Sequence, residues 1–351
     1  MKLPWIREAV RQLHPYVPGE QPQERGFIKL NTNENPYPPS PRVLEAIRTA
    51  ANEDLRLYPD PSARAVREVA AERYGVSPEQ ILVGNGSDEL LSLVVRACVD
   101  HGDVVAYPHP TYSLYDTLVQ IQTGRIQRVP YGKDFCLPDG LEEMRPKLVF
   151  ICHPNSPSGT AVEIDRIRAL ASRLPATLVV VDEAYVDFAS ASALPLIQEL
   201  PNIVVLRTLS KSFSLAGLRI GLAVGRSQMI AELGKLKDSY NVDRLAIVGA
   251  RAALEDYAWM QENVRRIRST RERLIAALRS LGFEVPQSEA NFVLARRRGE
   301  RLDPLYRALR ERRILVRYFD TPELEDALRI TVGTDTEVDA LVAALKEIES
   351  V

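Results

Sequence analysis

Two stretches of the chain, 178–185 (LVVVDEAY) and 203–224 (IVVLRTLSKSFSLAGLRIGLAV), decide the fold. Each begins with a continuous run of β-branched and aliphatic residues, and polar side chains follow directly. Such runs, separated by amphipathic segments, are typical of strands that are buried on both faces of a mainly parallel sheet. A sheet of this kind binds its ligand beyond the carboxyl ends of its strands. The residues that follow each run are therefore the first candidates for a functional site.

Similar runs recur along the chain, and most of them begin roughly 20–30 residues apart, which is the length of one strand–helix unit. The expected strands are 81–83, 104–107, 126–129, 148–151, 178–181, 203–206 and 218–224. We therefore predict an α/β fold with a mainly parallel sheet that helices cover on both faces.

The N-terminal part departs from this rhythm. Prolines interrupt 14–19 (HPYVPG) and 31–39 (NTNENPYPP), so neither segment can be the interior of a helix. Ser40, which precedes a proline, predicts a helix that extends to about residue 51. Ser62 is expected to cap a second helix that ends at Gly75.

Beyond residue 224 the pattern becomes α+β and indicates a second, smaller domain. The expected elements are one or two long helices over 245–281, strands at 292–295, 314–318 and 328–331, and helices at 304–312 and 337–348. We accordingly expect three parts: an N-terminal segment that joins the small domain (1–35), a large domain (36–240), and a connecting helix with the small C-terminal domain (241–351).

Composition excludes several classes of protein. Lys and Arg total 45 against 47 Asp and Glu among 351 residues, a formal net charge of −2, so a nucleic-acid partner is not expected. The three cysteines lie far apart and match neither a disulfide framework nor a zinc-binding pair, and we expect no metal. No apolar run approaches the roughly 18 residues that a membrane span needs, and no signal-peptide core opens the chain. We expect a cytoplasmic protein without a membrane partner.

The first strand is followed by a glycine loop, 84–89 (GNGSDE). Backbone amides at Gly86 and Ser87 would surround one point at the start of a helix, and the helix dipole would add to their attraction for a phosphate. The loop is not a dinucleotide fingerprint, because Glu89 stands where a third glycine is needed. An ordinary glycine turn with Ser87 as helix cap is the alternative.

Three further strands are followed by polar or aromatic side chains. Tyr112 could stack on a planar ring, or it could be a half-buried tyrosine at the start of a helix. Asn155 is presented between two prolines, although an Asx-turn would explain it equally. Asp182 ends a buried strand, where a carboxylate is costly unless a metal, a protonated nitrogen or a hydrogen bond satisfies it. A helix-capping aspartate is the alternative there.

Lys211 lies in a loop of small residues at the same edge of the sheet. A partly desolvated lysine beside other cations can lose its proton and form a Schiff base. Thr208, Ser210 and Arg219 would supply hydroxyls and a guanidinium suited to a phosphate. A solvated loop lysine is the alternative.

Together these residues fit one ligand, pyridoxal 5′-phosphate (PLP), a phosphorylated aromatic aldehyde that acts as an electron sink. Lys211 would hold the aldehyde, and Asp182 would keep the ring nitrogen protonated. Tyr185 and Asn155 could bond to the ring oxygen, and Tyr112 could cover the ring. The phosphate would be held by the loop and hydroxyl residues with the guanidinium: Gly86, Ser87, Thr208, Ser210 and Arg219.

The chain resembles the fold-type I PLP-dependent aminotransferases, and within them most closely the histidinol-phosphate aminotransferases. The resemblance is carried in order by NENP (33–36), YPD (58–60), GNGSDE (84–89), PTY (110–112), PNSPSGT (154–160), VVDEAY (180–185), RTLSKSFSLAGLR (207–219) and LRITVG (328–333). It implies a seven-stranded large domain, a small domain built from both chain ends, and a homodimer with the active site at the interface. Ser156 and Ser158 depart from the Asn and Thr that relatives often carry.

The resemblance also assigns roles to individual positions. It places Asp182, Tyr185 and Lys211 in catalysis and adds Asp88 to the cofactor-binding set. Tyr58 is similar to the tyrosine that reaches the cofactor phosphate of the other subunit. The remaining positions are implied as substrate-binding: Arg329, Arg317, Tyr16, Asn33 and Tyr240.

The activity that this resemblance implies is transfer of an amino group from glutamate to imidazole acetol phosphate, giving histidinol phosphate and 2-oxoglutarate by a ping-pong mechanism through Lys211. Three alternatives stay open. An aromatic amino-acid aminotransferase and a threonine-phosphate decarboxylase would share the cofactor residues. A DNA-binding regulator with an aminotransferase-like domain would need an added helix-turn-helix.

Overall fold

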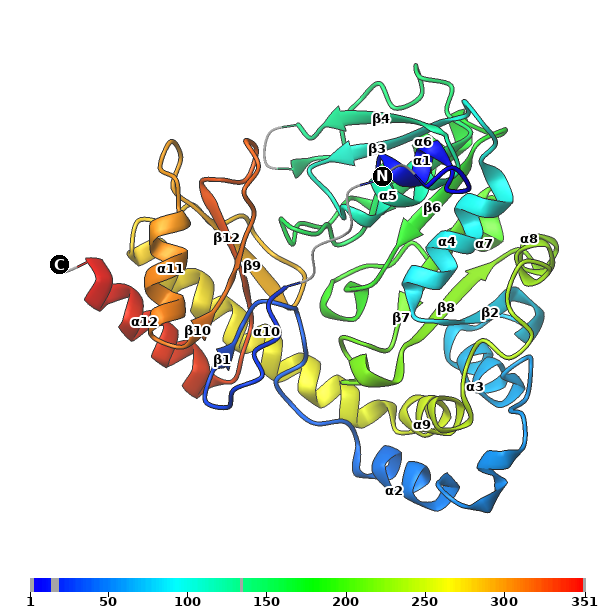
Figure 1. Ribbon diagram of the computed structural model, residues 1–351, viewed down its shortest axis with the longest axis horizontal. Coiled ribbons are helices and arrows are strands. Elements are labelled where there is room, and N and C mark those ends of the chain that lie inside the picture. The colour runs from blue at the N-terminus through cyan, green and yellow to red at the C-terminus, as the bar shows by residue number, and fades with distance from the viewer. Residues whose placement is uncertain (1–2, 14–18, 133–134, 350–351) are drawn as a thin grey trace.

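The computed structural model describes residues 3–13, 19–132 and 135–349. It contains a large domain with a seven-stranded sheet and a smaller domain with two short sheets. The long helix α10 (Tyr257–Ser280) runs from one domain to the other (Figure 1).

The large sheet has the strand order β2-β8-β7-β6-β5-β3-β4. Its strands are β2 (Ile81–Asn85), β3 (Val104–His109), β4 (Arg125–Pro130), β5 (Leu148–Cys152), β6 (Leu178–Asp182), β7 (Ile203–Thr208) and β8 (Ile220–Gly225). The pairs from β4 through β7 are parallel, whereas β8 runs antiparallel to both of its neighbours. The predicted α/β class with a mainly parallel sheet is confirmed.

Both faces of this sheet are covered. In β5, for example, Val149 and Ile151 belong to one buried apolar cluster, while Leu148 and Phe150 belong to another. Successive strand residues point to opposite faces, so each face has its own core. The covering helices include α4 (Ser87–Cys98), α5 (Leu114–Ile121), α6 (Ile164–Arg173), α7 (Leu196–Glu199), α8 (Ser227–Gly234) and α9 (Arg244–Glu255).

The starts of two helices test the predicted caps. Helix α2 (Pro41–Ala50) begins after Ser40, whose hydroxyl accepts a hydrogen bond from the Arg42 amide at 3.0 Å, as predicted. Helix α3 (Arg64–Tyr74) is not capped by Ser62. The carboxylate of Asp60 accepts the amides of Ser62 and Arg64 instead, at 2.9 and 2.8 Å.

The start of β8 also differs from the prediction. Residues 216–218 form the 3₁₀ turn η5 (Ala216–Leu218), and Arg219 adopts a left-handed φ of +53°. The strand therefore begins at Ile220 rather than at residue 218. Further 3₁₀ turns are η1 (Glu53–Arg56), η2 (Pro78–Gln80) and η4 (Val186–Phe188).

The small domain joins segments from both ends of the chain. Strand β1 (Ile28–Lys29) pairs in parallel with β10 (Ile314–Leu315), and a second sheet has the order β11-β12-β9. Its strands are β11 (Arg317–Tyr318), β12 (Ala327–Thr331) and β9 (Phe292–Arg296), and its helices are α11 (Asp303–Glu311) and α12 (Asp335–Glu349). The short α1 (Glu8–Arg11) lies beside α5 of the large domain (Figure 1). The domain boundaries given above stay a prediction.

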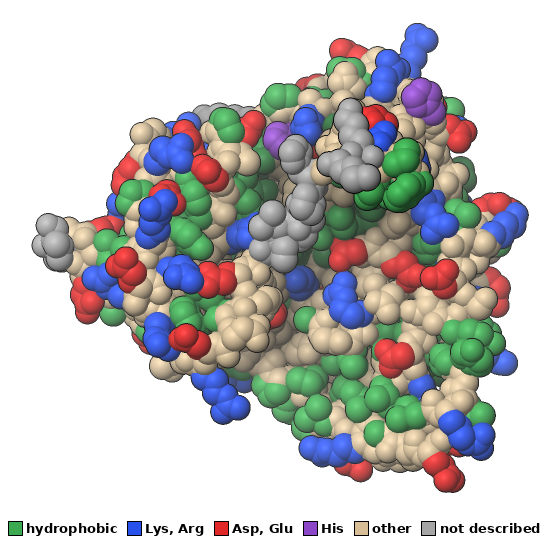
Figure 2. Space-filling model, in the orientation of Figure 1, with side chains coloured by type: hydrophobic (Ala, Val, Ile, Leu, Met, Phe, Trp, Pro, Cys, Tyr) green, Lys and Arg blue, Asp and Glu red, His purple; other side chains and the backbone are tan. Residues whose placement is uncertain are grey.

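The described residues contain no helix that is both long enough and apolar enough to cross a membrane. On the face drawn in Figure 2, Lys and Arg side chains are interspersed with Asp and Glu rather than gathered in one patch.

Candidate active site

A cavity of about 320 Å³ lies where the carboxyl ends of the large-domain strands meet β11 and β12 of the small domain. The predicted residues on its wall are Asn33, Ser87, Asp88, Tyr112, Asp182, Tyr185, Thr208, Ser210, Lys211, Arg219, Arg317 and Arg329. Segments from across the chain therefore converge on one chamber, as the edge-of-sheet argument requires.

Lys211 extends from the loop after β7 into this cavity. Its Nζ lies 3.4 Å from the Thr32 carbonyl oxygen and 5.8 Å from the centre of the Tyr185 ring. Burial lowers the pKa of Lys211 to about 8, and the nearby positive charge of Arg329 acts in the same direction. About one tenth of the amine is therefore neutral at pH 7, far more than for an ordinary lysine, and is available as a base or nucleophile.

Asp182 ends β6 on the cavity wall and is 3% exposed. Its Oδ2 accepts the Tyr115 hydroxyl at 2.8 Å, and its Oδ1 accepts the Ala184 amide at 3.2 Å. Burial raises the pKa of Asp182 to about 6 despite these two bonds. A buried carboxylate of this kind is best satisfied by a cation that enters the cavity.

Polar groups for an anion lie at another part of the wall, where α4 begins. Arg219 places Nη1 3.5 Å from Ser210 Oγ and Nη2 3.1 Å from Asp88 Oδ2. Gly86 has φ +80°, and a Cβ there would lie 2.5 Å from Arg219 Nη2, so glycine leaves room for the guanidinium. The helix N-terminus, the hydroxyls and the guanidinium together form a cradle for a phosphate.

Gly221, the second residue of β8, has a similar purpose. A Cβ on Gly221 would lie 2.4 Å from the backbone carbon of Gly86 and 2.5 Å from the amide nitrogen of Ser87. The absence of a side chain therefore lets β8 pack directly against the loop that precedes α4.

Three of the predicted polar residues are held by hydrogen bonds of their own. The Tyr185 hydroxyl accepts the Asn33 amide at 2.9 Å, and burial raises its pKa to about 12. The Tyr112 hydroxyl donates to Asp88 Oδ1 at 3.1 Å. Asn155 is fully buried and is not among the cavity-lining residues, because its amide is bonded to the Thr111 and Ser158 side chains.

Two arginines enter the cavity from the small domain. Arg317 of β11 lies directly opposite Arg329 of β12 in the antiparallel pair. Arg329 donates to the Asn31 carbonyl oxygen at 3.0 Å and to Ser156 Oγ at 3.2 Å. Both guanidiniums also lie about 5 Å from the Phe319 ring, at 5.3 and 5.5 Å. This cross-strand pair concentrates positive charge suited to a phosphate or a carboxylate.

Besides Asn155 and Gly86, which are not among the residues that line the cavity, two predicted residues lie in another part of the molecule, and one is outside the described residues. Tyr58 and Tyr240 stack on each other with ring centres 4.3 Å apart, and they are 78% and 46% exposed. They line a separate shallow hollow rather than the cavity. Tyr16 falls in the part of the chain that the structure does not describe.

Residues 25–345 match the family described as "Aminotransferase class I and II". The chain belongs to this family. It is 48% identical over 347 residues to Histidinol-phosphate aminotransferase 1 of Trichormus variabilis, covering 98% of this chain and 99% of the relative. It is 46% identical over 349 residues to Histidinol-phosphate aminotransferase 1 of Burkholderia pseudomallei, covering 97% and 98%.

Solved structures of similar fold agree with this assignment. Histidinol-phosphate aminotransferase from Sinorhizobium meliloti, in complex with PLP, superposes with a TM-score of 0.90 at 30% identity and covers 99% of this chain and 98% of its own. L-threonine-O-3-phosphate decarboxylase from Porphyromonas gingivalis has a TM-score of 0.82 at 23% identity, covering 92% and 99%. At that identity the second likeness concerns the fold alone.

Aminotransferases of this family use PLP, and the cavity of this aminotransferase fits that group. A buried carboxylate suits the pyridine nitrogen, a lysine with a lowered pKa suits the aldehyde, and the cradle around Arg219 suits the phosphate. The fit involves Lys211, Asp182 and Arg219, which follow or flank three neighbouring strands.

Several residues that line the cavity of this aminotransferase or contact its side chains were missed from the sequence. Tyr115, which bonds to Asp182, lies within an apolar helix face, where a tyrosine reads as core. Thr32 and Ser156 also lie beside Lys211 and Arg329. Small polar residues in loops give no periodic signal that would single them out.

Proposed function

We propose that this protein is a histidinol-phosphate aminotransferase that transfers an amino group from glutamate to imidazole acetol phosphate. The observation that carries the proposal is the convergence of Lys211, Asp182 and the Arg317–Arg329 pair on one cavity. The relatives at 46–48% identity over nearly the whole chain support this substrate.

PLP, when bound, supplies an electron sink for the negative charge that develops at the substrate α-carbon. In our proposal Asp182 faces the ring nitrogen and Tyr185 the ring oxygen. The amides of Gly86 and Ser87 hold the phosphate together with Thr208, Ser210 and Arg219, while Asp88 orients Arg219 through their 3.1 Å contact.

Lys211 is the proton-transfer group of the proposal. Its lowered pKa, about 8, lets the amine accept a proton from the α-carbon and return it without a large energetic penalty. Burial raises the pKa of Asp182 to about 6, but a cation at the ring nitrogen favours the ionised carboxylate. The proposal thus assigns proton transfer to Lys211 and the counter-charge for the ring nitrogen to Asp182.

The small-domain arginines serve both half-reactions of the proposal. Glutamate and 2-oxoglutarate carry a second carboxylate, whereas histidinol phosphate carries a phosphate, and a guanidinium binds either oxyanion through two parallel hydrogen bonds. Arg317 and Arg329 lie on adjacent strands, so one anion can contact both. Asn33 is proposed to support the substrate site through its bond to Tyr185.

The test is the visible spectrum of the purified PLP-bound protein during titration with amines. We expect histidinol phosphate and glutamate to bleach the absorption of the bound cofactor, while phenylalanine and threonine phosphate leave it unchanged at equal concentration. Lys211→Ala should abolish the spectral shift that bound PLP shows in the wild-type protein. Bleaching by phenylalanine or threonine phosphate with no response to histidinol phosphate would contradict the substrate.

A homodimer is part of the same proposal. Leu55, Leu57, Tyr58 and Tyr240 are exposed by 53%, 46%, 78% and 46% around one hollow, and apolar side chains gather in the region of α2 on the lower part of Figure 2. An exposed apolar patch of this kind is typical of a protein–protein interface. In the dimer Tyr58 would reach the partner's cofactor phosphate. Sedimentation of wild type and Tyr58→Ala measures the oligomeric state, and the PLP affinity of both proteins tests the role of Tyr58 in the dimer.

The expected cytoplasmic location stays a prediction.

A further inference from the structure

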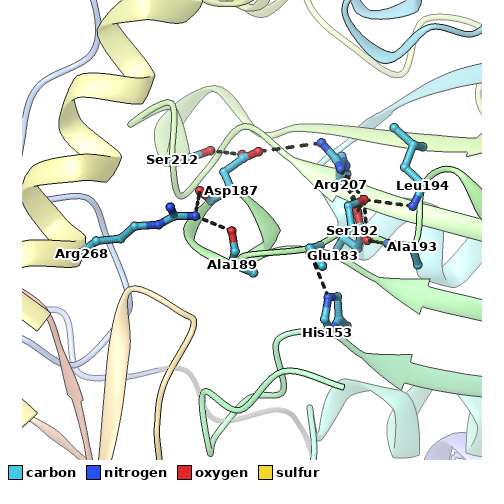
Figure 3. A network of polar contacts seen from close by, with 11 residues as sticks. His153, Glu183, Asp187, Ala189, Ser192, Ala193, Leu194, Arg207, Ser212 and Arg268 are labelled. Atoms are coloured by element: carbon cyan, nitrogen blue, oxygen red, sulfur yellow. Dashed lines mark hydrogen bonds and ion pairs between the residues drawn. The ribbon is translucent and has the colours of Figure 1, made fainter. Parts of the chain in front are cut away.

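A buried polar network lies beside the Lys211 loop, and its members are absent from the described residues that line the cavity (Figure 3). At its centre Arg207, near the end of β7, donates two hydrogen bonds to Glu183 Oε2 at 2.9 and 3.1 Å. The Arg207 side chain is 11% exposed and that of Glu183 fully buried. Arg207 Nη1 also lies 3.8 Å from Asp187 Oδ1. The network thus pairs one guanidinium with two carboxylates.

Asp187 connects this network to the segment that carries Lys211. Its Oδ2 accepts a hydrogen bond from the hydroxyl of Ser212, the residue directly after Lys211. Ser212 is 2% exposed, so water does not compete for that bond. In Figure 3 the two side chains point toward each other from separate loops.

The turn that carries Asp187 is itself held in place. Arg268 of α10 donates to the carbonyl oxygens of Phe188 at 3.1 Å, Asp187 at 3.4 Å and Ala189. These bonds satisfy carbonyls at the end of the 3₁₀ turn η4 and fix its position against the helix that joins the two domains. The carboxylate of Asp187 is therefore presented from a rigid support.

A second anchor holds the same segment from another side. Asn35 Nδ2 donates to the carbonyl oxygens of Lys211 and Ser212 at 3.0 and 3.1 Å. The loop around Lys211 is held in the core by Leu209, Phe213 and Leu215, and these polar bonds fix the backbone between those apolar anchors. A displacement of about 1 Å at a reacting group can cost about 100-fold in rate.

We propose that Asp187 is a positioning residue, which acts through the Ser212 hydroxyl to fix the backbone of Lys211 and hence the place of its amine in the cavity. The inference rests on the function proposed above, because it assigns Lys211 the reacting amine. The competing explanation is that the network only stabilises the large domain. Under that explanation substitutions would lower the unfolding temperature and leave the amine of Lys211 unaltered.

The test measures the amine directly in cofactor-free protein. Competitive labelling with acetic anhydride over a range of pH, followed by mass spectrometry, gives the labelling rate and pH midpoint of Lys211. The variants are Ser212→Ala and Asp187→Ala, with Asp326→Ala as the control. Asp326 is a matched acid, because its side chain is 15% exposed against 16% for Asp187 and is likewise paired with an arginine.

We expect Ser212→Ala to raise the Lys211 midpoint by at least about 0.5 pH units, because a loosened segment lets the amine reach water, which favours its protonated form. The charged groups that face Lys211, which are Arg329, Glu34, Asp88 and Arg219, are unchanged in this variant. Asp187→Ala should shift the midpoint in the same direction, because it removes the acceptor of the Ser212 hydroxyl. The control should match the wild type.

In the PLP-bound enzyme we expect both variants to lower kcat about 10-fold or more, with KM for the amine donor changed less than twofold. The double variant should be no worse than the more severe single one, since both changes remove the same bond. An unchanged pH midpoint of Lys211 labelling in Ser212→Ala, or additive losses of kcat in the double variant, overturns the proposal. The labelling uses no substrate, so it stands even if the protein acts on an amine other than histidinol phosphate.

Discussion

Replacing Asp182 by asparagine should stabilise the cofactor-free protein at neutral pH while weakening its use of PLP. Burial raises the pKa of Asp182 in the folded protein to about 6 from an ordinary 3.8. Because the folded pKa lies above the unfolded one, ionising this carboxyl costs folding stability. The cost is negligible below about pH 4 and develops as the pH rises toward 6.

The magnitude follows from the shift of about two pKa units. At about 1.4 kcal/mol per unit, the ionised carboxyl costs the folded protein about 3 kcal/mol at pH 7.5 and about 1 kcal/mol at pH 4.5. Asparagine removes the charge and can keep both hydrogen bonds, because its amide can donate to the Tyr115 hydroxyl while its oxygen accepts the Ala184 amide. With an unfolding entropy of about 2.1 cal/mol/K per residue, the gain corresponds to about 4 °C.

Scanning calorimetry of cofactor-free wild type and Asp182→Asn at pH 7.5 and 4.5 measures both the gain and its pH dependence. Asp88→Asn serves as the control, since the Asp88 side chain is 44% exposed and its replacement should give no comparable gain. PLP should raise the unfolding temperature of the wild type more than that of Asp182→Asn, because the variant lacks a counter-charge for the ring nitrogen. A variant that is less stable at pH 7.5, or a difference that does not depend on pH, would refute the reasoning.

Three other outcomes follow from the cavity. The rate at which PLP attaches to Lys211 should rise with pH around a midpoint of about 8, because the neutral amine is the nucleophile. Stopped-flow absorbance measures this rate, and a midpoint near 10.5 would contradict the effect of burial on the pKa of Lys211. Arg329→Lys should raise KM for histidinol phosphate by about 10- to 100-fold through loss of bidentate contacts, with the spectrum of bound PLP unchanged; steady-state assays that show an unaltered KM would exclude its role. Gly221→Ala should lower the free energy of unfolding by about 1–3 kcal/mol and weaken PLP binding, because the added Cβ would lie 2.4 Å from the backbone of Gly86. Unchanged unfolding and PLP affinity would show that the loop at Gly86 shifts without cost.

The parallel sheet could be predicted because its signal is local. Each strand is a continuous apolar run, since both of its faces are buried, and the strand–helix spacing repeats along the chain. The failures occurred where backbone geometry overrides that pattern. Leu218 extends the apolar run of β8, yet it ends a 3₁₀ turn, and the left-handed φ of Arg219 separates the two. Ser62 has the composition of a cap, but Asp60 reaches the free amides first.

The residues on the cofactor side of the candidate site could be predicted from the sequence for the same geometric reason. Asp182 ends β6, whereas Lys211 and Gly86 follow β7 and β2, and the carboxyl ends of parallel strands meet at one edge. The residues on the substrate side could not be predicted from strand positions in this way. Arg317 and Arg329 belong to short strands of the small domain, and only the resemblance of their motifs pointed to them. No spacing rule brings residue 31 or 32 beside residue 211 or 329, because those contacts depend on how the two domains meet.

Burial acts on the two titrating groups of the cavity in opposite directions. It raises the pKa of Asp182 to about 6 and lowers that of Lys211 to about 8, so both values approach neutrality from their ordinary extremes. Each group therefore lies within about one or two pKa units of pH 7, where one added charge is enough to change its protonation state. In the proposed complex a cation beside Asp182 would hold that carboxylate ionised, and a phosphate near Arg219 and Arg329 would offset the positive charge that lowers the pKa of Lys211. The ligand's own charges would thus set the protonation states that the reaction needs, because burial has already brought both pKa values close to neutrality.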